Sequence, residues 1–187
     1  MPGARRHGRA KDTGTVTVNR MPVLTLWAAV VAQREGQPWE TALTLGKAVA
    51  VLNAQSKGRR LGIYGPSDEK AREQKLHPEA RPARRHGRMV EVLGREVPVV
   101  KARAVVGGKA IAPGEVERYL ERSFGERLAD VREAMEGLAA AYPRGVLKHA
   151  AYGLYEQFRP TVPAGTRGWG ARGELDLRRL AAMRGEG

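Results

Sequence analysis

Residues 21–58, MPVLTLWAAVVAQREGQPWETALTLGKAVAVLNAQSKG, decide the fold, because they carry two helical patterns separated by a turn at Gly36. In residues 23–31 the apolar side chains recur at helical spacing. Pro22 suits the first turn of a helix, where its missing backbone donor is not needed. The first helix is therefore predicted to open at residue 21 or 22 and to stop at Gly36.

The second pattern predicts a helix from residue 38 or 39 to about Lys57, with Gly58 in the left-handed position that often follows a helix. Both helices are apolar around much of their circumference, so the pair must pack against the rest of the chain or against a second copy. One interpretation is an αα-hairpin that serves the core or forms a homodimer through residues 23–56.

The other interpretation is a helix-turn-helix within residues 28–47, in which the second helix would lie in the major groove of DNA. A small residue, a glycine in the turn and later apolar contacts fit that motif. The second helix has few polar side chains that could contact bases, and these are Glu40, Thr41, Thr44 and Lys47. Both interpretations stay open at the level of the sequence.

A β-hairpin is predicted further along the chain, from residues 89–93 and 96–100 around a two-residue turn at Gly94 and Arg95. Pro98 would have to lie on an edge, because proline cannot donate to a strand ladder. Residues 105–111 are expected to add a third short strand. The sequence therefore predicts one small antiparallel sheet.

Beyond Pro113 the apolar period becomes helical, and the stripe keeps its phase whether the helix is continuous or broken at Gly125. Another helix is predicted over residues 146–158, and a last short one after Asp176, which suits an N-cap position. The stripe consists of Val116, Leu120, Phe124, Leu128, Val131, Met135 and Leu138. The predicted fold class is α+β and mostly helical, with an N-terminal αα-hairpin, a short β-hairpin and C-terminal helices.

Composition along the chain predicts four segments. Residues 1–20 form a disordered basic arm, residues 21–65 the N-terminal helical hairpin, residues 66–88 a charged linker, and residues 89–187 the hairpin with the helical region. The linker contains three prolines, alternates in charge and has almost no apolar residues, which is typical of an exposed loop.

Charge is the main indication of function, since 33 Lys and Arg face 20 Asp and Glu, a net charge of +13. Residues 58–90 carry +5 and residues 142–187 carry +4, whereas residues 113–141 carry −3. A clustered surplus with a pI near 10.7 is the electrostatic signature expected of a nucleic-acid-binding protein. The alternative is a solvated basic surface in an arginine-rich composition.

The candidate phosphate-binding residues come from the Arg-rich segments. Trp169, between two glycines, is a candidate for stacking on an exposed base. An anion at the start of the last helix would tolerate the two cations in its first turn, where the helix dipole disfavours positive charge. The candidate cations are Lys57, Arg59, Arg60, Arg84, Arg85, Arg88, Arg167, Arg172, Arg178 and Arg179.

Other function classes have little support in the sequence. The chain has no cysteine, which excludes disulfides and thiolate sites and fits a cytoplasmic protein. Its apolar runs fall short of the roughly 20 residues that span a bilayer, and no secretory pattern follows the basic N-terminus. Neither Gly46-Lys47 nor Gly108-Lys109 completes a phosphate-binding loop. We expect no cofactor, no metal and no catalytic set, although an enzyme remains an alternative.

The sequence thus predicts a nucleic-acid-binding protein that contacts phosphates, with DNA the favoured partner and no membrane association. Phosphate contacts position a protein on nucleic acid without specifying a sequence. Two alternatives are left open. One is a homo-oligomeric assembly protein whose basic segments only confer solubility, and the other is binding to RNA or single strands.

Overall fold

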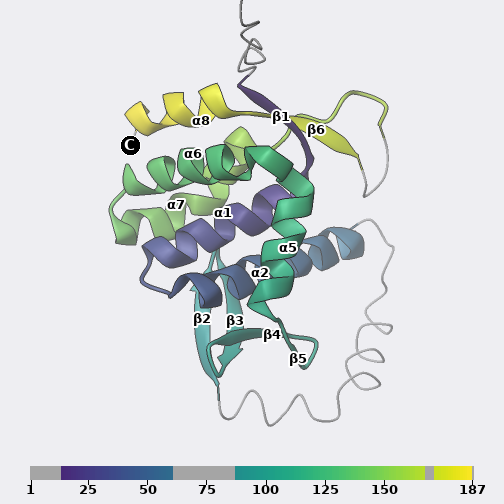
Figure 1. Ribbon diagram of the computed structural model, residues 1–187. Coiled ribbons are helices and arrows are strands. Elements are labelled where there is room, and N and C mark those ends of the chain that lie inside the picture. The colour runs from purple at the N-terminus through teal and green to yellow at the C-terminus, as the bar shows by residue number, and fades with distance from the viewer. Residues whose placement is uncertain (1–13, 61–86, 167–170, 187) are drawn as a thin grey trace, which may run out of the picture.

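The computed structural model describes residues 14–60, 87–166 and 171–186, and for residues 58–60 only the backbone. It confirms an α+β protein that is mostly helical, with two small antiparallel sheets. The helices form the middle of the molecule in Figure 1. The two-stranded sheet and the last helix lie at the upper end of this view, and the four-stranded sheet lies at the lower end.

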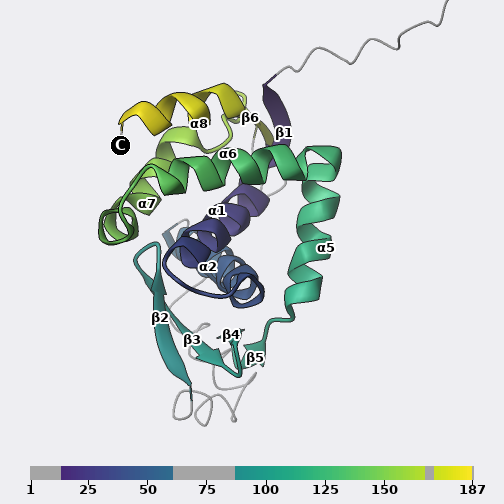
Figure 2. The same cartoon turned by 60° about the vertical axis from the view of Figure 1, so that its left-hand side comes forward.

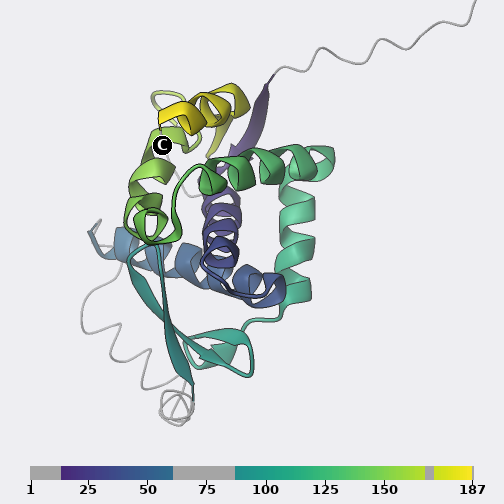
Figure 3. The same cartoon turned by 90° about the vertical axis from the view of Figure 1, so that its left-hand side faces the viewer.

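Helix α1 (Arg20–Arg34) is the centre of the core, because residues 22–32 are buried without interruption. The indole nitrogen of Trp27 donates to the backbone oxygen of Ala151 over 2.8 Å, and its ring meets Phe158 edge-on at 5.2 Å. Figure 3 shows α1 enclosed by other helices. These are α2 (Trp39–Arg60), α5 (Pro113–Phe124), α6 (Leu128–Ala140) and α7 (Arg144–Phe158).

The chain itself therefore supplies the cover that the apolar helix pair requires. A single hydrophobic cluster joins α1 and α2 to the C-terminal helices and to both sheets. Burial of α1 removes the physical reason for a homodimer through residues 23–56, which was to shield this surface. The predicted boundary between the N-terminal hairpin and the C-terminal region does not divide the core.

Helices α1 and α2 pack unusually closely at Gly46. A Cβ atom built on Gly46 would overlap the backbone oxygen of Thr25 and lie 3.0 Å from the amide nitrogen of Ala29. A side chain larger than hydrogen would thus force the two backbones apart. Helix α2 continues to Arg60, so the prediction that Gly58 follows its end is wrong.

The helical stripe after Pro113 is divided at Gly125, which settles the choice left open by the sequence. Gly125 has a φ of +56°, a conformation that glycine adopts readily, and it ends α5. A short 3-10 turn, Gly125–Arg127, connects α5 to α6. The two helices run in different directions in Figure 2, so one stripe covers two sides of the core. Its buried members are Val116, Leu120, Phe124, Val131, Met135 and Leu138.

Strand β1 (Thr15–Asn19) corrects the predicted arm, because residues 15–20 are part of the fold. It pairs antiparallel with β6 (Arg172–Asp176), with Val16 opposite Leu175. Val16 and Leu175 are buried, whereas Thr17 is exposed, which is the alternation of a half-buried strand. Residues 1–13, the rest of the predicted arm, lie outside the described residues.

The second sheet has the order β2-β3-β4-β5 and is built from three successive hairpins. Its first turn is Leu93 and Gly94, with φ of +50° and +75°, and not Gly94 and Arg95 as predicted. Positive φ at both residues matches the twist of the flanking strands, and burial of Leu93 offsets its strained backbone. The strands are β2 (Arg88–Val92), β3 (Arg95–Val100), β4 (Arg103–Val106) and β5 (Lys109–Ala110).

The predicted edge position of Pro98 needs a correction, since β3 lies between β2 and β4. The β3–β4 ladder includes only Val99 and Val100, so Pro98 lies beyond its end. The sheet is tied to α2 by Thr44, whose hydroxyl accepts from the amide of Ala104 over 2.9 Å. Arg88, the last residue of the predicted linker, begins β2.

The C-terminal helix α8 (Leu177–Met183) begins where the sequence predicts. The Asp176 carboxylate accepts from the amide of Arg178 over 2.9 Å, which confirms the N-cap. Leu175 and Leu180, which flank this cap in the positions of a hydrophobic staple, are fully buried. A 3-10 turn, Arg184–Glu186, follows α8. Within the described ranges, none of the helices has the length and apolar character needed to cross a bilayer.

Candidate nucleic-acid interface

The structure describes five of the predicted cations and places them apart. Figures 1 and 2 show β6 and α8 at the opposite end of the molecule from the four-stranded sheet. Arg172, Arg178 and Arg179 belong to the first end, and Arg88 to the sheet. Lys57 lies about 20 Å along α2 from Thr44, which contacts the sheet, at 1.5 Å per residue. The predicted cations therefore do not form one surface here.

The remaining predicted residues cannot be placed. Arg59 and Arg60 lie in the last turn of α2, where only the backbone is described. The others lie outside the described residues, and these are Arg84, Arg85, Arg167 and Trp169.

The cations of α8 have partners within the fold. The guanidinium of Arg179 donates to the backbone oxygen of Gln157 over 2.8 Å, in the last turn of α7, where a helix dipole favours positive charge. The carboxylate of Asp176 lies beside Arg178 at the start of α8. The contact with Gln157 accounts for the position of Arg179, whereas the contact of Asp176 is with the backbone amide of Arg178.

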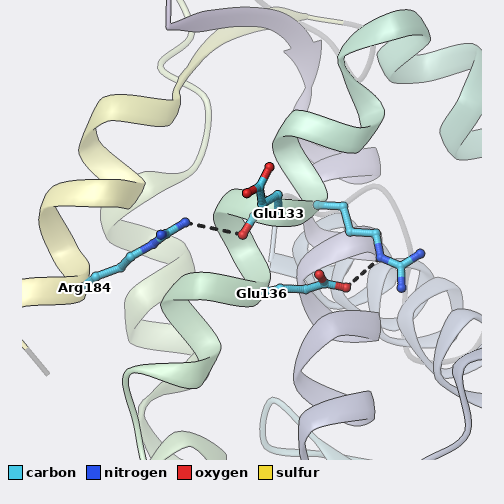
Figure 4. Close-up of polar contacts among 4 residues, drawn as sticks. Glu133, Glu136 and Arg184 are labelled. Carbon is cyan, nitrogen blue, oxygen red and sulfur yellow. Dashed lines mark hydrogen bonds and ion pairs between the residues drawn. The ribbon is translucent and has the colours of Figure 1, made fainter.

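Arg184 also has a structural role, at the contact between the 3-10 turn Arg184–Glu186 and α6. Its guanidinium donates to the backbone oxygen of Glu133 over 3.4 Å (Figure 4) and to that of Ala134 over 3.3 Å. A Cβ on Gly137 would overlap this guanidinium, so the glycine makes room for it. The Glu136 carboxylate in the same view accepts from Arg132 over 2.7 Å. Cations in this region are thus matched by carboxylates or by backbone oxygens.

The open end of the four-stranded sheet differs, because its cations lie in sequence free of acids. Residues 97–114 contain Lys101 and Arg103 at this end, and Lys109 at the far end of β4, but no Asp or Glu, and residues 80–90 are also free of acids. Strand pairing sets Arg88 opposite Val99, so the start of β2 lies beside the turn that carries Lys101 and Arg103. All three of these cations are exposed, and Arg88 also donates to the Gln37 side chain over 2.7 Å.

Acidic groups gather at the other end of the same sheet. Glu91 stands directly opposite Glu96, a like-charge pair that is unfavourable in a ladder. Lys148 offsets it through an ion pair with Glu91 at 3.2 Å. The turn end of the sheet therefore combines Glu91 and Glu96 with Arg95 and Lys148, whereas the open end carries Arg88, Lys101 and Arg103 in stretches without acids.

The turn between β3 and β4 presents its cations at a cost in backbone energy. Lys101 and Ala102 have φ of +49° and +62°, which is unfavourable by about 1–2 kcal/mol for each non-glycine residue. Leu93 shares this conformation but is buried, whereas Lys101 and Ala102 are exposed and gain nothing from packing. Positive φ at both residues is what a two-residue hairpin turn requires, as at Leu93 and Gly94, so the conformation follows from the turn itself.

Sequence reasoning missed Lys101 and Arg103, because it looked for runs of arginine. The useful signal was the absence of acids from residues 97–114, together with the hairpin that joins this stretch to Arg88. If the density of positive charge is the only criterion, it selects the segments before β2 and after α7 as the candidate interface. The acid-free stretch of the folded part lies between these segments.

The helix-turn-helix interpretation fails on burial. Thr41 and Thr44 are buried, and the Thr44 hydroxyl is committed to the oxygen of Thr41 and the amide of Ala104. The ammonium group of Lys47 lies 3.8 Å from the ring centre of Tyr119, and burial lowers the pKa of Lys47. Helix α2 cannot present these side chains to a groove, so the pair is an αα-hairpin within the core.

A small-molecule site is poorly supported within the described ranges. A cavity of about 240 Å³ lies between α1, α6 and α7, lined by Arg34, Glu136 and Arg144 among others. Ligand pockets typically measure about 300–1,000 Å³. Across those ranges no group of three His, Asp or Glu side chains is arranged to hold a metal ion.

Comparison with family models, curated proteins and solved structures finds no match to this chain. Its function must accordingly be argued from the site and not from the fold, since one fold serves many functions. The basic open end of the four-stranded sheet is the candidate interface.

Proposed function

We propose that this protein binds nucleic acid through the phosphate backbone, with Arg88, Lys101 and Arg103 at the open end of the sheet as its first contacts. The observation that carries the proposal is the strand register, which joins two acid-free stretches at one exposed end. Duplex DNA is the partner to test first. The proposal concerns affinity for phosphates and does not include sequence specificity.

The described charges support this choice of surface. The side chains that the structure describes include 20 Lys and Arg and 15 Asp and Glu, a surplus of +5 out of +13. The cations of residues 113–140 lie among acids of the same helices, and two of them form the ion pairs Arg127–Asp130 and Arg132–Glu136. The open end of the sheet lacks such neighbours along the chain, so its cations remain available for phosphates.

The test is the salt dependence of binding to a fluorescent duplex. Each phosphate neutralised contributes about −0.9 to the slope of log K against log salt concentration. The double variant Lys101→Gln and Arg103→Gln should make the slope shallower by about 1.8 and weaken binding at 100 mM salt by at least about tenfold. Anisotropy titrations between 50 and 300 mM salt measure both quantities.

Arg118→Gln with Arg122→Gln is the matched control, since it removes two exposed cations from the acid-rich helix α5. We expect this variant to bind with the wild-type slope. Equal slopes for the two double variants would show that binding depends on net charge and not on the sheet. Failure of the wild-type protein to bind duplex at 50 mM salt would refute the proposal itself.

A second titration separates duplex from single-strand binding. If the sheet recognises the paired backbone, unlabelled duplex should displace the labelled duplex more effectively than a single strand of equal length. Preference for the single strand would redirect the proposal to the RNA or single-strand alternative, in which base stacking contributes to affinity.

A further inference from the structure

A small cavity lies where α1, α6 and α7 meet, and two arginines contribute to its lining. Its volume is about 240 Å³, and its polar side chains are Gln33 and Arg34 of α1, Glu136 of α6 and Arg144 of α7. Two apolar residues complete the lining. This volume is below the range that is usual for drug-sized ligands, but it is enough for a small polar anion. The charges around the cavity therefore decide what it can hold.

Arg34 brings to this cavity a positive charge that has no carboxylate partner within the described ranges. One terminal nitrogen of its guanidinium donates to the backbone oxygen of Tyr142 over 3.3 Å, and its Nε atom is buried without a hydrogen-bond partner. The ion pairs of those ranges do not include Arg34. A partly buried charge is unfavourable unless it is paired, so an anion in the cavity would stabilise this guanidinium.

The carboxylates near the cavity do not cancel this charge. Glu136 accepts from Arg132 over 2.7 Å (Figure 4), so it already has a cationic partner. Glu35 follows Arg34 in the chain and its Oε1 atom is buried, but it does not line the cavity. Among the lining residues, their chain neighbours and their ion-pair partners, three arginines and two glutamates leave a surplus of +1. The surroundings of the cavity therefore favour an anion.

The start of α7 adds to this attraction. Arg144 is the first residue of the helix and is exposed, so its guanidinium can be reached from solvent. The helix has no side-chain N-cap and no acid in its first turn. Its first amides lack an acceptor within the helix, and its dipole places positive potential beside Arg144. An anion at this position would interact favourably with both the dipole and the guanidinium.

We propose that the cavity binds a phosphate group, held by the guanidinium groups of Arg34 and Arg144 and by the side-chain amide of Gln33. Guanidinium forks match the spacing of phosphate oxygens. The donors come from two different helices, and a tetrahedral anion accepts from several directions at once, which a planar carboxylate does less well. The phosphate group can belong to a small phosphate compound or to a nucleic-acid backbone, so the inference does not depend on the proposed function.

The experiment titrates inorganic phosphate into the full chain at constant ionic strength and follows the backbone amide signals by ¹H–¹⁵N NMR. The signals of Gly145 and Val146, in the first turn of α7, report on the site. Arg144→Gln and Arg34→Gln each remove one proposed contact, and Arg144 is exposed, so its variant should fold even if Arg34→Gln does not. Arg118→Gln is the control, because it removes an exposed cation from α5.

Phosphate should shift these amide signals with a Kd of about 1 mM or lower, whereas chloride should not. Arg144→Gln should raise this Kd at least about tenfold, because a charge-assisted hydrogen bond is lost, and Arg118→Gln should leave it unchanged. The site is refuted if the signals do not respond to phosphate up to about 20 mM. It is also refuted if Arg118→Gln weakens binding as much as Arg144→Gln does.

A second titration, with a DNA duplex in place of phosphate, identifies the source of the group. If the duplex shifts the same amide signals and phosphate competes with it, the site supports contact with a nucleic-acid backbone. If phosphate binds and the duplex leaves these signals unchanged, the site supports binding of a small phosphate compound. Failure of the protein to bind duplex at all would refute the proposed function and leave the phosphate site standing.

Discussion

Gly46→Ala tests the closest contact of the fold, the one between α1 and α2. The added methyl group would overlap the backbone oxygen of Thr25 and press on Ala29. Both obstacles belong to the buried helix α1, which is enclosed by four other helices and cannot move aside freely. The substitution therefore requires that the axes of the two helices separate.

Two opposing contributions set the change in the free energy of unfolding of Gly46→Ala. Overpacking of a dense core costs about 1–3 kcal/mol, while replacing glycine by alanine within a helix is favourable by about 0.5–1 kcal/mol. The overpacking term is larger, so we expect a net loss of about 1–2 kcal/mol. For a chain of this size the corresponding decrease in Tm is about 2–8 °C.

Gly153→Ala is the control, because Gly153 is an exposed residue of α7 with nothing within 4 Å of a Cβ atom built on its backbone. It keeps only the favourable helix term, about 0.5–1 kcal/mol. Urea denaturation followed by circular dichroism gives the unfolding free energy of each variant. If Gly46→Ala is as stable as Gly153→Ala, the close approach of α1 and α2 is wrong.

Two further predictions concern buried polar groups. Thr44→Val removes the acceptor for the amide of Ala104 and should lower the free energy of unfolding by about 1–3 kcal/mol. Thr44→Ser keeps the hydroxyl and should lower it less. Equal losses for the two variants in urea denaturation would contradict the hydrogen bond. Burial raises the pKa of Tyr155 to about 12, above its value of about 10 in an unfolded chain. The unfolded state therefore loses this proton first, and stability should fall between pH 10 and 12, by roughly 2–3 kcal/mol at most. Tyr155→Phe should show a smaller fall over the same interval, and an identical fall would assign the effect to other groups.

The helices were predictable because their information is local. The pattern of residues 23–31 predicts an apolar helix wherever it lies in the fold, and α1 occupies that range. The Asp176 cap likewise depends only on its immediate neighbours. The state of Gly125 could not be settled in this way, because the apolar stripe keeps the same phase in a straight helix and in a broken one. Only packing around α1 decides between them.

Strand β1 was missed for the opposite reason. Its alternation covers Thr15 to Val18, too few residues to predict a strand, and its partner β6 lies near the other end of the sequence. No local pattern records a pairing over such a separation. The candidate site was missed for the same reason. In the sequence Lys101 and Arg103 are isolated cations, and only strand pairing sets their stretch beside Arg88.

The register of the first hairpin decides how the cations are spaced at the open end of the sheet. With the predicted turn at Gly94 and Arg95, Arg88 would stand directly opposite Lys101, a like-charge pair that destabilises a ladder. In the observed register Arg88 faces Val99, and Lys101 lies beyond the strand in its own turn. The cations are thereby spread around the end of the sheet instead of opposing one another. A spread of this kind avoids strong repulsion between the cations in the free protein, so the turn that sequence reasoning misplaced is the one on which the proposed phosphate contacts depend.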